Sequence, residues 1–492
     1  MMKIIVTFLL FFTASIAGAK DYYVDAENGH DRNSGQTEQK AWASLKKVNK
    51  KKFKAGDRLL FRADTKYHGQ LVIKSSGTEE KPIIVSAYGD GARPQIHGKG
   101  RQDYTLLLEN AEYIVVSGLD ITNMGKERKA GRAGVVVRAF NSGELHHVVL
   151  KNLTIRHVNG SLKKKEDGGR AIHVQVRGDR VPSRFIDFQI LDNHIYHTSR
   201  NGIGFGGIAS RANWFPHLQV VIRGNLMEQV PGDGIVVVGS DGALIEGNVL
   251  RDFPDILPLG EAAAGIWPWS SDNTVIQFNE VSGHKAKWDA QGYDSDFNSI
   301  GTIIQNNFSH DNYGGFLLVC NNGEKFGQDK NIGTKGSIIR NNVSFNDGIR
   351  PYPTNREDTF SPIFHLTGPI EDTRIYGNVI IVPRKEDGVD NTLVRIENWG
   401  DSWPQNSVFE DNDFYIEGEM NIDLNERTDV LFRKNRFFGK ITGFEMSDND
   451  LQASAPLSLK EVRNEALMTK VTIPAQTRAH GISMVSPPPV RD

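Results

Sequence analysis

The sequence predicts an all-β fold, a single-stranded parallel solenoid in which short strands wind repeatedly around one core. The first observation is a phrase of two apolar residues, two variable residues and Asn, which recurs along much of the chain. The second is the alternation of Val, Ile, Leu and Phe in the segments between these phrases. The third is the closest spacing of the phrase, in the low twenties of residues, as from Asn225 to Asn248. Alternating strands at that period are typical of β-helix coils, and the period is too short for propeller blades or two-helix repeats.

The recurring Asn residues are expected to be structural. Asn tolerates the left-handed conformation of a tight turn, and its amide can bond to the Asn of the next coil. The phrase ends at Asn152, Asn193, Asn225, Asn248, Asn279, Asn307, Asn342, Asn378, Asn412 and Asn435.

The first nineteen residues have the layout of a secretory signal peptide. Lys3 precedes an apolar run over residues 4–12, and the small residues Ala17-Gly18-Ala19 follow. The apolar run is too short to span a bilayer, and no other long apolar segment occurs. We therefore expect cleavage after residue 19, a secreted or periplasmic protein, and no integral membrane segment.

The remaining chain divides into three parts. Residues 20–100 are expected to form an N-terminal cap with a short helix beginning near Trp42 and the first coils. Residues 101–440 carry the repeat and are expected to form the β-helix. Residues 441–492 lose the repeat, and we expect a C-terminal cap with a short helix over 458–468 and an extended tail at 486–489.

Composition excludes several function classes. The net charge is -2, so the composition lacks the excess of basic residues that is typical of nucleic-acid-binding proteins. Cys320 is the single cysteine, so no internal disulfide supports the fold and no Cys/His cluster suggests zinc. We expect a monomer.

The repeat, the opening segment DYYVDAENGHDRNSGQ and the later FKAGDRLLFR resemble exported bacterial members of the right-handed parallel β-helix superfamily, often called pectin-lyase-like. The resemblance covers roughly residues 100–440 by repeat pattern. It implies a right-handed β-helix and, for most enzymes of that superfamily, cleavage of polysaccharides. The paired Asp of polygalacturonases is absent at Gly232-Asp233-Gly234, and no residue role carries over from any single family.

A second recurring phrase, Gly followed by an apolar residue, marks one outer face. If the apolar residue points inward, alternation sends the next residue and the one two beyond it outward. In successive coils this places Trp267 and Trp269 beside Asp294 and Asp296. These four side chains form a square, which small residues border upstream. The outward series is expected to continue downstream at Leu317, Val319, Leu366, Arg395 and Glu397.

This square predicts a sugar-binding groove, because indole rings stack on pyranose rings and two nearby carboxylates can act as acid and base or nucleophile. The alternative is that the Trp residues pack beneath a loop and the Asp residues are solvated. The candidate catalytic residues are Asp233, Asp289, Asp294 and Asp296. The candidate substrate-binding residues are Trp267, Trp269, His284, Lys287, Trp288, His310, His173 and Arg177.

Three functions are consistent with these residues. The first is an exported glycoside hydrolase that uses two of the carboxylates and needs no cofactor. The second is a polysaccharide lyase in which Lys287 or His284 is the base and Ca²⁺ or Arg177 neutralises a uronate. The third is a non-catalytic protein that binds glycans or lies on a surface. All three have a polysaccharide or oligosaccharide as partner, and the mixture of Asp and Trp favours the hydrolase.

Overall fold

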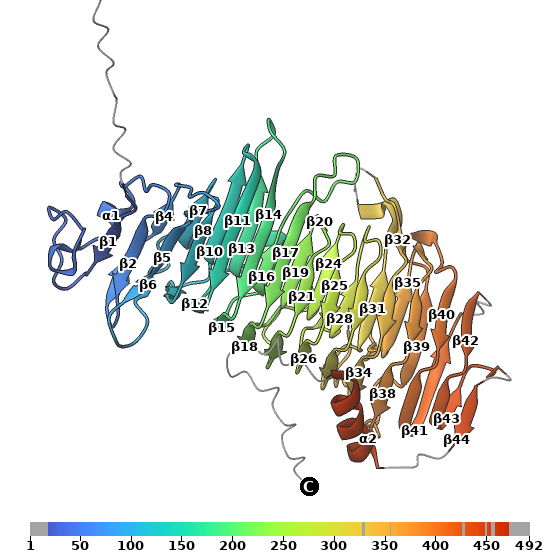
Figure 1. Ribbon diagram of the computed structural model, residues 1–492. Coiled ribbons are helices and arrows are strands. Elements are labelled where there is room, and N and C mark those ends of the chain that lie inside the picture. Colours follow the sequence, from blue (N-terminus) through green and yellow to red (C-terminus); the bar gives the residue numbers. More distant parts are fainter. Residues whose placement is uncertain are drawn as a thin grey trace, which may run out of the picture.

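The computed structural model describes residues 18–326, 330–354, 356–425, 429–447, 450–453 and 458–471. The chain forms an elongated right-handed parallel β-helix, with coils stacked from the N-terminal to the C-terminal end (Figure 1). One continuous apolar core runs inside the coils, from Tyr22 to Phe437. The predicted fold class is therefore confirmed. The predicted signal peptide lies outside the described residues except for its last two positions.

Three parallel sheets, here called faces 1, 2 and 3, enclose the core. Over residues 58–397 each coil contributes at least one strand to each face in that order, and the coils at the two ends contribute to fewer faces. Face 1 consists of β1 (Asp21–Val24), β2 (Arg58–Arg62), β5 (Ile83–Tyr88), β8 (Ile114–Ser117), β11 (Gly143–Lys151), β14 (Ser183–Leu191), β17 (His217–Arg223), β21 (Leu244–Glu246), β25 (Val275–Gln277), β29 (Ile303–Gln305), β33 (Ile338–Arg340), β37 (Arg374–Tyr376), β40 (Ser407–Glu410) and β42 (Val430–Arg433), with β20 (Ser240–Asp241) beside β17.

Face 2 consists of β3 (Lys66–His68), β6 (Gln95–His97), β9 (Asp120–Asn123), β12 (Thr154–Val158), β15 (His194–Thr198), β18 (Leu226–Glu228), β22 (Val249–Arg251), β26 (Glu280–Ser282), β30 (Phe308–His310), β34 (Val343–Phe345), β38 (Val379–Val382), β41 (Asp413–Asp423), β43 (Arg436–Thr442) and β44 (Leu451–Ala453). Face 3 consists of β4 (Leu71–Ile73), β7 (Tyr104–Glu109), β10 (Ala133–Phe140), β13 (Arg170–Arg177), β16 (Asn201–Phe205), β19 (Ile235–Val238), β24 (Ile266–Trp269), β28 (Tyr293–Ser295), β31 (Leu317–Cys320), β35 (Phe364–Thr367) and β39 (Thr392–Glu397), which joins β41.

An asparagine ladder occupies the turn between faces 1 and 2. Each side-chain N–H donates to the Oδ1 of the Asn in the next coil, at 2.9 Å from Asn248 to Asn279 and at 3.0 Å from Asn307 to Asn342. The ladder runs unbroken from Asn193 to Asn435. Because these side chains are buried, the ladder pairs polar groups that water cannot reach.

Two details of the ladder differ from the prediction. The exposed Asn152 is not a rung, because the buried Leu153 takes that place and donates its N–H to Asn193. The left-handed residue is also not the ladder Asn but the residue before it, for example Asn306 (φ 56°) before Asn307. Asn, Asp and Gly fill this preceding position in most coils because they tolerate positive φ.

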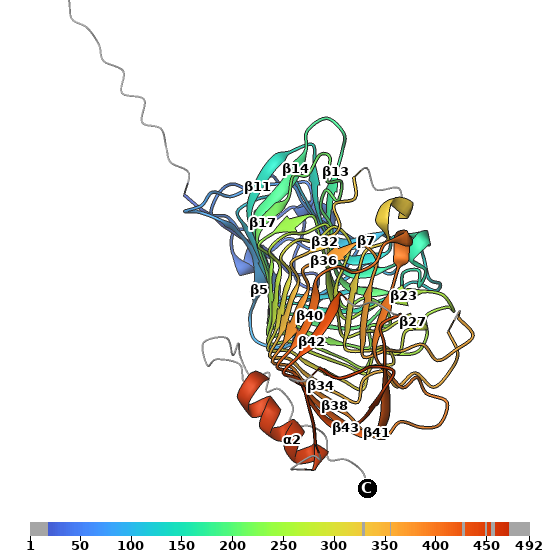
Figure 2. The ribbon, with the colours of Figure 1, turned by 90° about the vertical axis from the view of Figure 1, so that its right-hand side faces the viewer.

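The two ends of the stack carry short helices. At the N-terminal end, α1 (Leu45–Val48) is capped by Ser44, whose side chain accepts the N–H of Lys47. At the C-terminal end, α2 (Leu459–Ala466) and the following turn to Val471 pack on the outside of face 2 (Figure 2). No helix in the described ranges has both the length and the apolar character of a membrane span.

Candidate functional site

The candidate site lies on the outer side of face 3, where β24 and β28 are neighbours. The register pairs Ile266 with Tyr293, so Trp267 lies beside Asp294 and the next outward positions hold Trp269 and Asp296. The structure thus brings together the two Trp and two Asp residues that the repeat alignment grouped.

Downstream, the predicted alternation is wrong by one residue on two strands. Leu317, Val319 and Leu366 are fully buried in the core. The outward residues are instead Leu318, Cys320 and His365, and His365 pairs with the outward Arg395.

Glycine makes this part of face 3 thin and hollow. At the start of the strands, a Cβ on Gly234 would meet the carbonyl oxygen of Gly265 at 2.6 Å, and a Cβ on Gly265 would meet that of Gly292 at 2.3 Å. Farther along, Gly204 and Gly206 leave a hollow of about 150 Å³ between the side chains of His173 and Trp267. This hollow opens on the outer surface. Asp233 is the carboxylate that lines it, and Asp294 and Asp296 follow in the next coil, beyond Trp267 and Trp269.

The three carboxyl groups of Asp289, Asp294 and Asp296 repel one another. Burial raises the pKa of Asp289 to about 7, and the charge of Asp296 contributes to this shift. Burial and the charges of Asp289 and Asp296 hold the pKa of Asp294 well above its usual range. Since a carboxyl group with a pKa of about 7 is protonated in about half of the molecules at neutral pH, Asp289 can act there as a general acid.

Asp296 is held differently from its neighbours. Its Oδ1 accepts the N–H of Phe297 at 2.6 Å and the S–H of Cys320 at 3.1 Å. Burial raises the pKa of Asp296, while these two hydrogen bonds oppose that shift because they stabilise the ionised carboxylate. Asp296 is therefore the member of the group best suited to act as a nucleophile or base.

Two of the candidate residues have a buried polar atom without a hydrogen-bond partner among the described residues. They are Oδ1 of Asp294 and Nε1 of Trp269. Buried polar atoms are nearly always paired, so this acceptor and this donor are available to bind hydroxyl groups of a ligand.

The backbone at Asp289 is strained and clamped. Asp289 (φ 57°) and Ala290 (φ 67°) are both left-handed, which is uncommon for residues other than Gly, Asn and Asp. The fully buried Arg350 donates to the carbonyl oxygens of Asp289 at 2.7 Å and Ala286 at 2.8 Å. Sequence reasoning missed Arg350 because it lies in a loop insertion, far along the chain from Asp289.

Asp233 and Trp267, both predicted to act on substrate, are instead engaged within the protein. Asp233 is fully buried and forms an ion pair with Arg200 at 2.5 Å. Burial alone would raise its pKa, but the charges of Lys164 and Arg200 and the hydrogen bonds to the carboxylate outweigh this effect and lower the pKa to about 2. The indole N–H of Trp267 donates to Asp233, and the ammonium of Lys164 lies 5.0 Å from the ring centre. Trp267 is only 4% exposed, so Trp269, which is half-buried, offers the accessible indole.

Other predicted substrate-binding residues also have partners elsewhere. His284 is fully buried, stacks on Phe253 and bonds the carbonyl oxygen of Gly232, and burial lowers its pKa to about 4. Lys287 forms an ion pair with Asp255. His310 lies on face 2 against Phe308, paired with Asp311 and Glu280, which corrects its predicted place beside the carboxylates.

The last three predicted residues lie around the site. Trp288 adjoins Asp289 and stacks on Phe360, with ring centres 6.0 Å apart. His173 faces the hollow, and burial beside three arginines holds its pKa well below the usual value. Arg177 is exposed and lines a separate, more open hollow along face 3. Within the described part of the chain, no group of three or more His, Cys, Asp or Glu residues is arranged to hold a metal ion.

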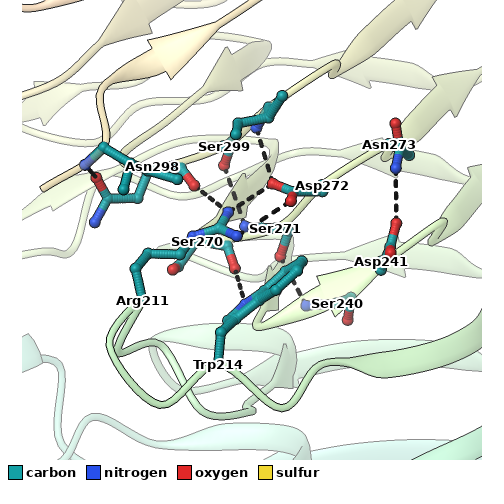
Figure 3. A network of polar contacts seen from close by, with 12 residues as sticks. Arg211, Trp214, Ser240, Asp241, Ser270, Ser271, Asp272, Asn273, Asn298 and Ser299 are labelled. Atoms are coloured by element: carbon teal, nitrogen blue, oxygen red, sulfur yellow. Dashed lines mark hydrogen bonds and ion pairs between the residues drawn. The ribbon is translucent and has the colours of Figure 1, made fainter. Parts of the chain in front are cut away.

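The loop over residues 206–216 forms a wall at the end of β24, next to Trp269. The guanidinium of Arg211 lies between the ring of Trp214, 4.0 Å away, and the carboxylate of Asp272, 2.6 Å away (Figure 3). The indole N–H of Trp214 donates to the carbonyl oxygen of Ser270 at 3.1 Å. These contacts fix the wall to the turns that follow face 3.

The chain is similar to known β-helix proteins. A family profile described as a right handed beta helix region matches residues 171–356. The chain is 27% identical over 490 residues to lacto-N-biosidase of Bifidobacterium longum subsp. longum, a match that covers 80% of this chain and 28% of that protein. It is 29% identical over 170 residues to YwoF of Bacillus subtilis (strain 168), covering 32% of each. The chain thus spans less than a third of the length of either relative.

Among solved structures, the crystal structure of GH136 lacto-N-biosidase from Eubacterium ramulus is similar, with 25% sequence identity and a TM-score of 0.63. That similarity covers 81% of this chain and 68% of the crystallised one. The sheets and these comparisons together identify the chain as a right-handed parallel β-helix protein.

Proposed function

We propose that this chain is an exported glycoside hydrolase that cleaves an oligosaccharide, with Asp289 as general acid and Asp296 as nucleophile or base. The observation that carries the proposal is the crowding of Asp289, Asp294 and Asp296 on one hollowed outer face, with the pKa of Asp289 raised to about 7. Export rests on the signal-peptide layout of the first nineteen residues.

The two carboxyl groups divide the chemistry. Asp289 gives its proton to the glycosidic oxygen as the bond to the anomeric carbon breaks, and the leaving sugar departs as an alcohol. Asp296, ionised, attacks the anomeric carbon directly or takes a proton from the water that attacks it. In the direct case, Asp289 then removes a proton from the water that hydrolyses the glycosyl–Asp296 ester. Asp294, whose buried carboxyl group favours the protonated form, can bind a sugar hydroxyl.

The first substrate we propose is a lacto-N-bioside. The relatives in Bifidobacterium longum and Eubacterium ramulus are both named lacto-N-biosidase, and each match covers about four fifths of this chain. No specific contact favours the lyase alternative, because Lys287 is paired with Asp255 and His284 lies in the interior.

The test uses p-nitrophenyl β-lacto-N-bioside and a panel of neutral and acidic oligosaccharides. We expect release of nitrophenol by the wild type, and losses of about a hundredfold or more in kcat for Asp289→Asn and Asp296→Asn. Asp187→Asn on face 1 is the matched control and should retain activity. Full activity in both site variants would place the chemistry elsewhere.

Treatment with a chelator distinguishes a hydrolase from a Ca²⁺-dependent lyase. We expect unchanged turnover after treatment with EDTA and dialysis, and products without the ultraviolet absorbance of an unsaturated uronate. Activity that disappears with EDTA and returns with Ca²⁺, together with that absorbance, would support the lyase instead.

A further inference from the structure

The single cysteine of the chain lies against the proposed nucleophile. Cys320 ends β31, the strand that follows β28 on face 3, and is 2% exposed. Its sulfur is 3.1 Å from Oδ1 of Asp296. The register pairs Ser295 with Val319, so the next residue on each strand brings the thiol opposite the carboxylate.

The thiol is protonated and can therefore act as a donor to Asp296. Apolar side chains surround it, including Phe297 and Leu318, with Trp269 and Trp399 packed beside them. Burial and the charge of Asp296 hold the pKa of Cys320 well above its usual value. A thiol in this environment is neither a nucleophile nor a metal ligand, since both roles require the thiolate.

The second donor to Asp296 acts on the same oxygen. The N–H of Phe297 reaches Oδ1 at 2.6 Å, so both hydrogen bonds leave Oδ2 without a partner among the described residues. A carboxylate held through one oxygen cannot rotate without losing both bonds, and its other oxygen keeps a fixed direction.

We propose that Cys320 is a positioning residue for Asp296, whose S–H acts with the Phe297 N–H to hold Oδ1 and to present an ionised Oδ2 to the substrate. The catalytic consequence rests on the proposed function. The hydrogen bond itself does not, because it can be measured without a substrate.

The first measurement is the S–H stretching band in the Raman spectrum. Because the chain has one cysteine, this band reports Cys320 alone. We expect a band displaced from that of a free thiol, which moves as Asp296 titrates. In Asp296→Asn the band should shift toward the free-thiol position and lose that pH response. A free-thiol band in the wild type, unchanged in Asp296→Asn, would overturn the proposal.

Other charges near Asp296 must be separated from this response. The charged and titratable groups that act within this cluster are Asp233, Asp289, Asp294, Lys164 and Arg350. The band should keep its pH response in Asp289→Asn, and its midpoint should move to lower pH because a neighbouring negative charge is removed. A pH response that disappears in Asp289→Asn but persists in Asp296→Asn would show that the band reports the titration of Asp289 and not of Asp296. That result would overturn the proposal.

The second measurement compares Cys320→Ser, which keeps a donor, with Cys320→Ala, which removes it. We expect Cys320→Ala to lower kcat about tenfold with little change in KM, because a hydrogen bond to a charged group is lost. The acid limb of the pH–rate profile should move to higher pH, since the ionised Asp296 is less stabilised. Cys320→Ser should restore both.

Equal losses of kcat in the Ser and Ala variants, with unchanged pH profiles, would show that Cys320 acts only by packing and would overturn the proposal. Circular dichroism and thermal melts of both variants separate this outcome from misfolding. If the wild type cleaves no glycan, the proposed function fails, while the Raman measurement still decides whether Cys320 donates to Asp296.

Discussion

The decisive residues of the site are carboxyl groups of one chemical type with different surroundings. Asp233 faces Arg200 and has a pKa of about 2, whereas Asp289 lies among other carboxylates and has a pKa of about 7. The first group stabilises the fold as an ion, and the second is about half protonated at neutral pH. The sequence predicted which carboxyl groups lie on this face. It did not predict their different pKa values, because these depend on buried cations that other loops supply.

The raised pKa of Asp289 predicts how activity and stability change with pH. Below its unfolded value of about 3.8 the group is protonated in both states, so the folded state carries no penalty. As pH rises from there through about 7, the unfolded chain releases a proton that the folded chain retains, and stability falls. Activity should fall on the alkaline side near pH 7 because the general acid loses its proton.

Asp289→Asn should therefore be more stable than the wild type at pH 8. We expect its free energy of unfolding to be higher by roughly 1–2 kcal/mol, because the group is half-buried and partly screened by solvent. The difference should vanish near pH 4. Urea unfolding at both pH values, with Asp187→Asn as control, checks this. A variant that is less stable than the wild type at pH 8 would show that the ionised carboxylate is stabilised by its surroundings.

At the scale of the element, the turn between faces 1 and 2 combines two separate requirements. The ladder position needs a buried amide that can donate and accept along the stack, and the preceding position needs a residue that tolerates positive φ. The sequence repeat predicted the ladder because the amide recurs in successive coils. It did not separate the two positions, because Asn can satisfy either requirement and occurs at both in some turns.

The adjacent pair Asn341 and Asn342 tests this division. Asn342 is fully buried and bonds to Asn307, Ile304 and Asn378, so Asn342→Ala leaves several buried groups unpaired. Each such group costs about 1–3 kcal/mol, and we expect a loss of several kcal/mol. Asn341 (φ 55°) precedes it, and Asn341→Gly should cost less than about 1 kcal/mol because Gly adopts this conformation readily. Urea unfolding measures both, and equal losses would contradict the division.

At the scale of the whole molecule, the repeat determines the scaffold and the insertions determine the site. Strand order, the inward apolar row and the outward Trp and Asp row follow from a pattern that each coil repeats, so the sequence predicted them. The lateral contacts do not repeat. Arg350 clamping the Asp289 loop and Lys164 covering Trp267 each depend on one insertion meeting another, and spacing along the chain carries no signal for that.

The continuous core predicts that a charge inside one central coil disrupts the whole stack. Ile304 on β29 is fully buried, and its neighbours in the adjacent coils, Ile276 and Ile339, are buried as well. Ile304→Asp would place a carboxylate among these side chains without a partner, and such burial is unfavourable enough to prevent folding. Because each coil is stabilised by packing on its neighbours, loss of one central coil removes an interface from the coils on both sides.

Ile303→Asp is the matched control, since Ile303 lies on the same strand but points outward and is only half-buried. We expect Ile303→Asp to fold with a modest loss of stability and Ile304→Asp to be insoluble or to lack the circular dichroism of a β-sheet. Expression, solubility and far-ultraviolet spectra of the two variants provide the measurement. A soluble and folded Ile304→Asp protein would mean that the coil can open locally and hydrate the charge, and that the core is less cooperative than its continuous packing implies.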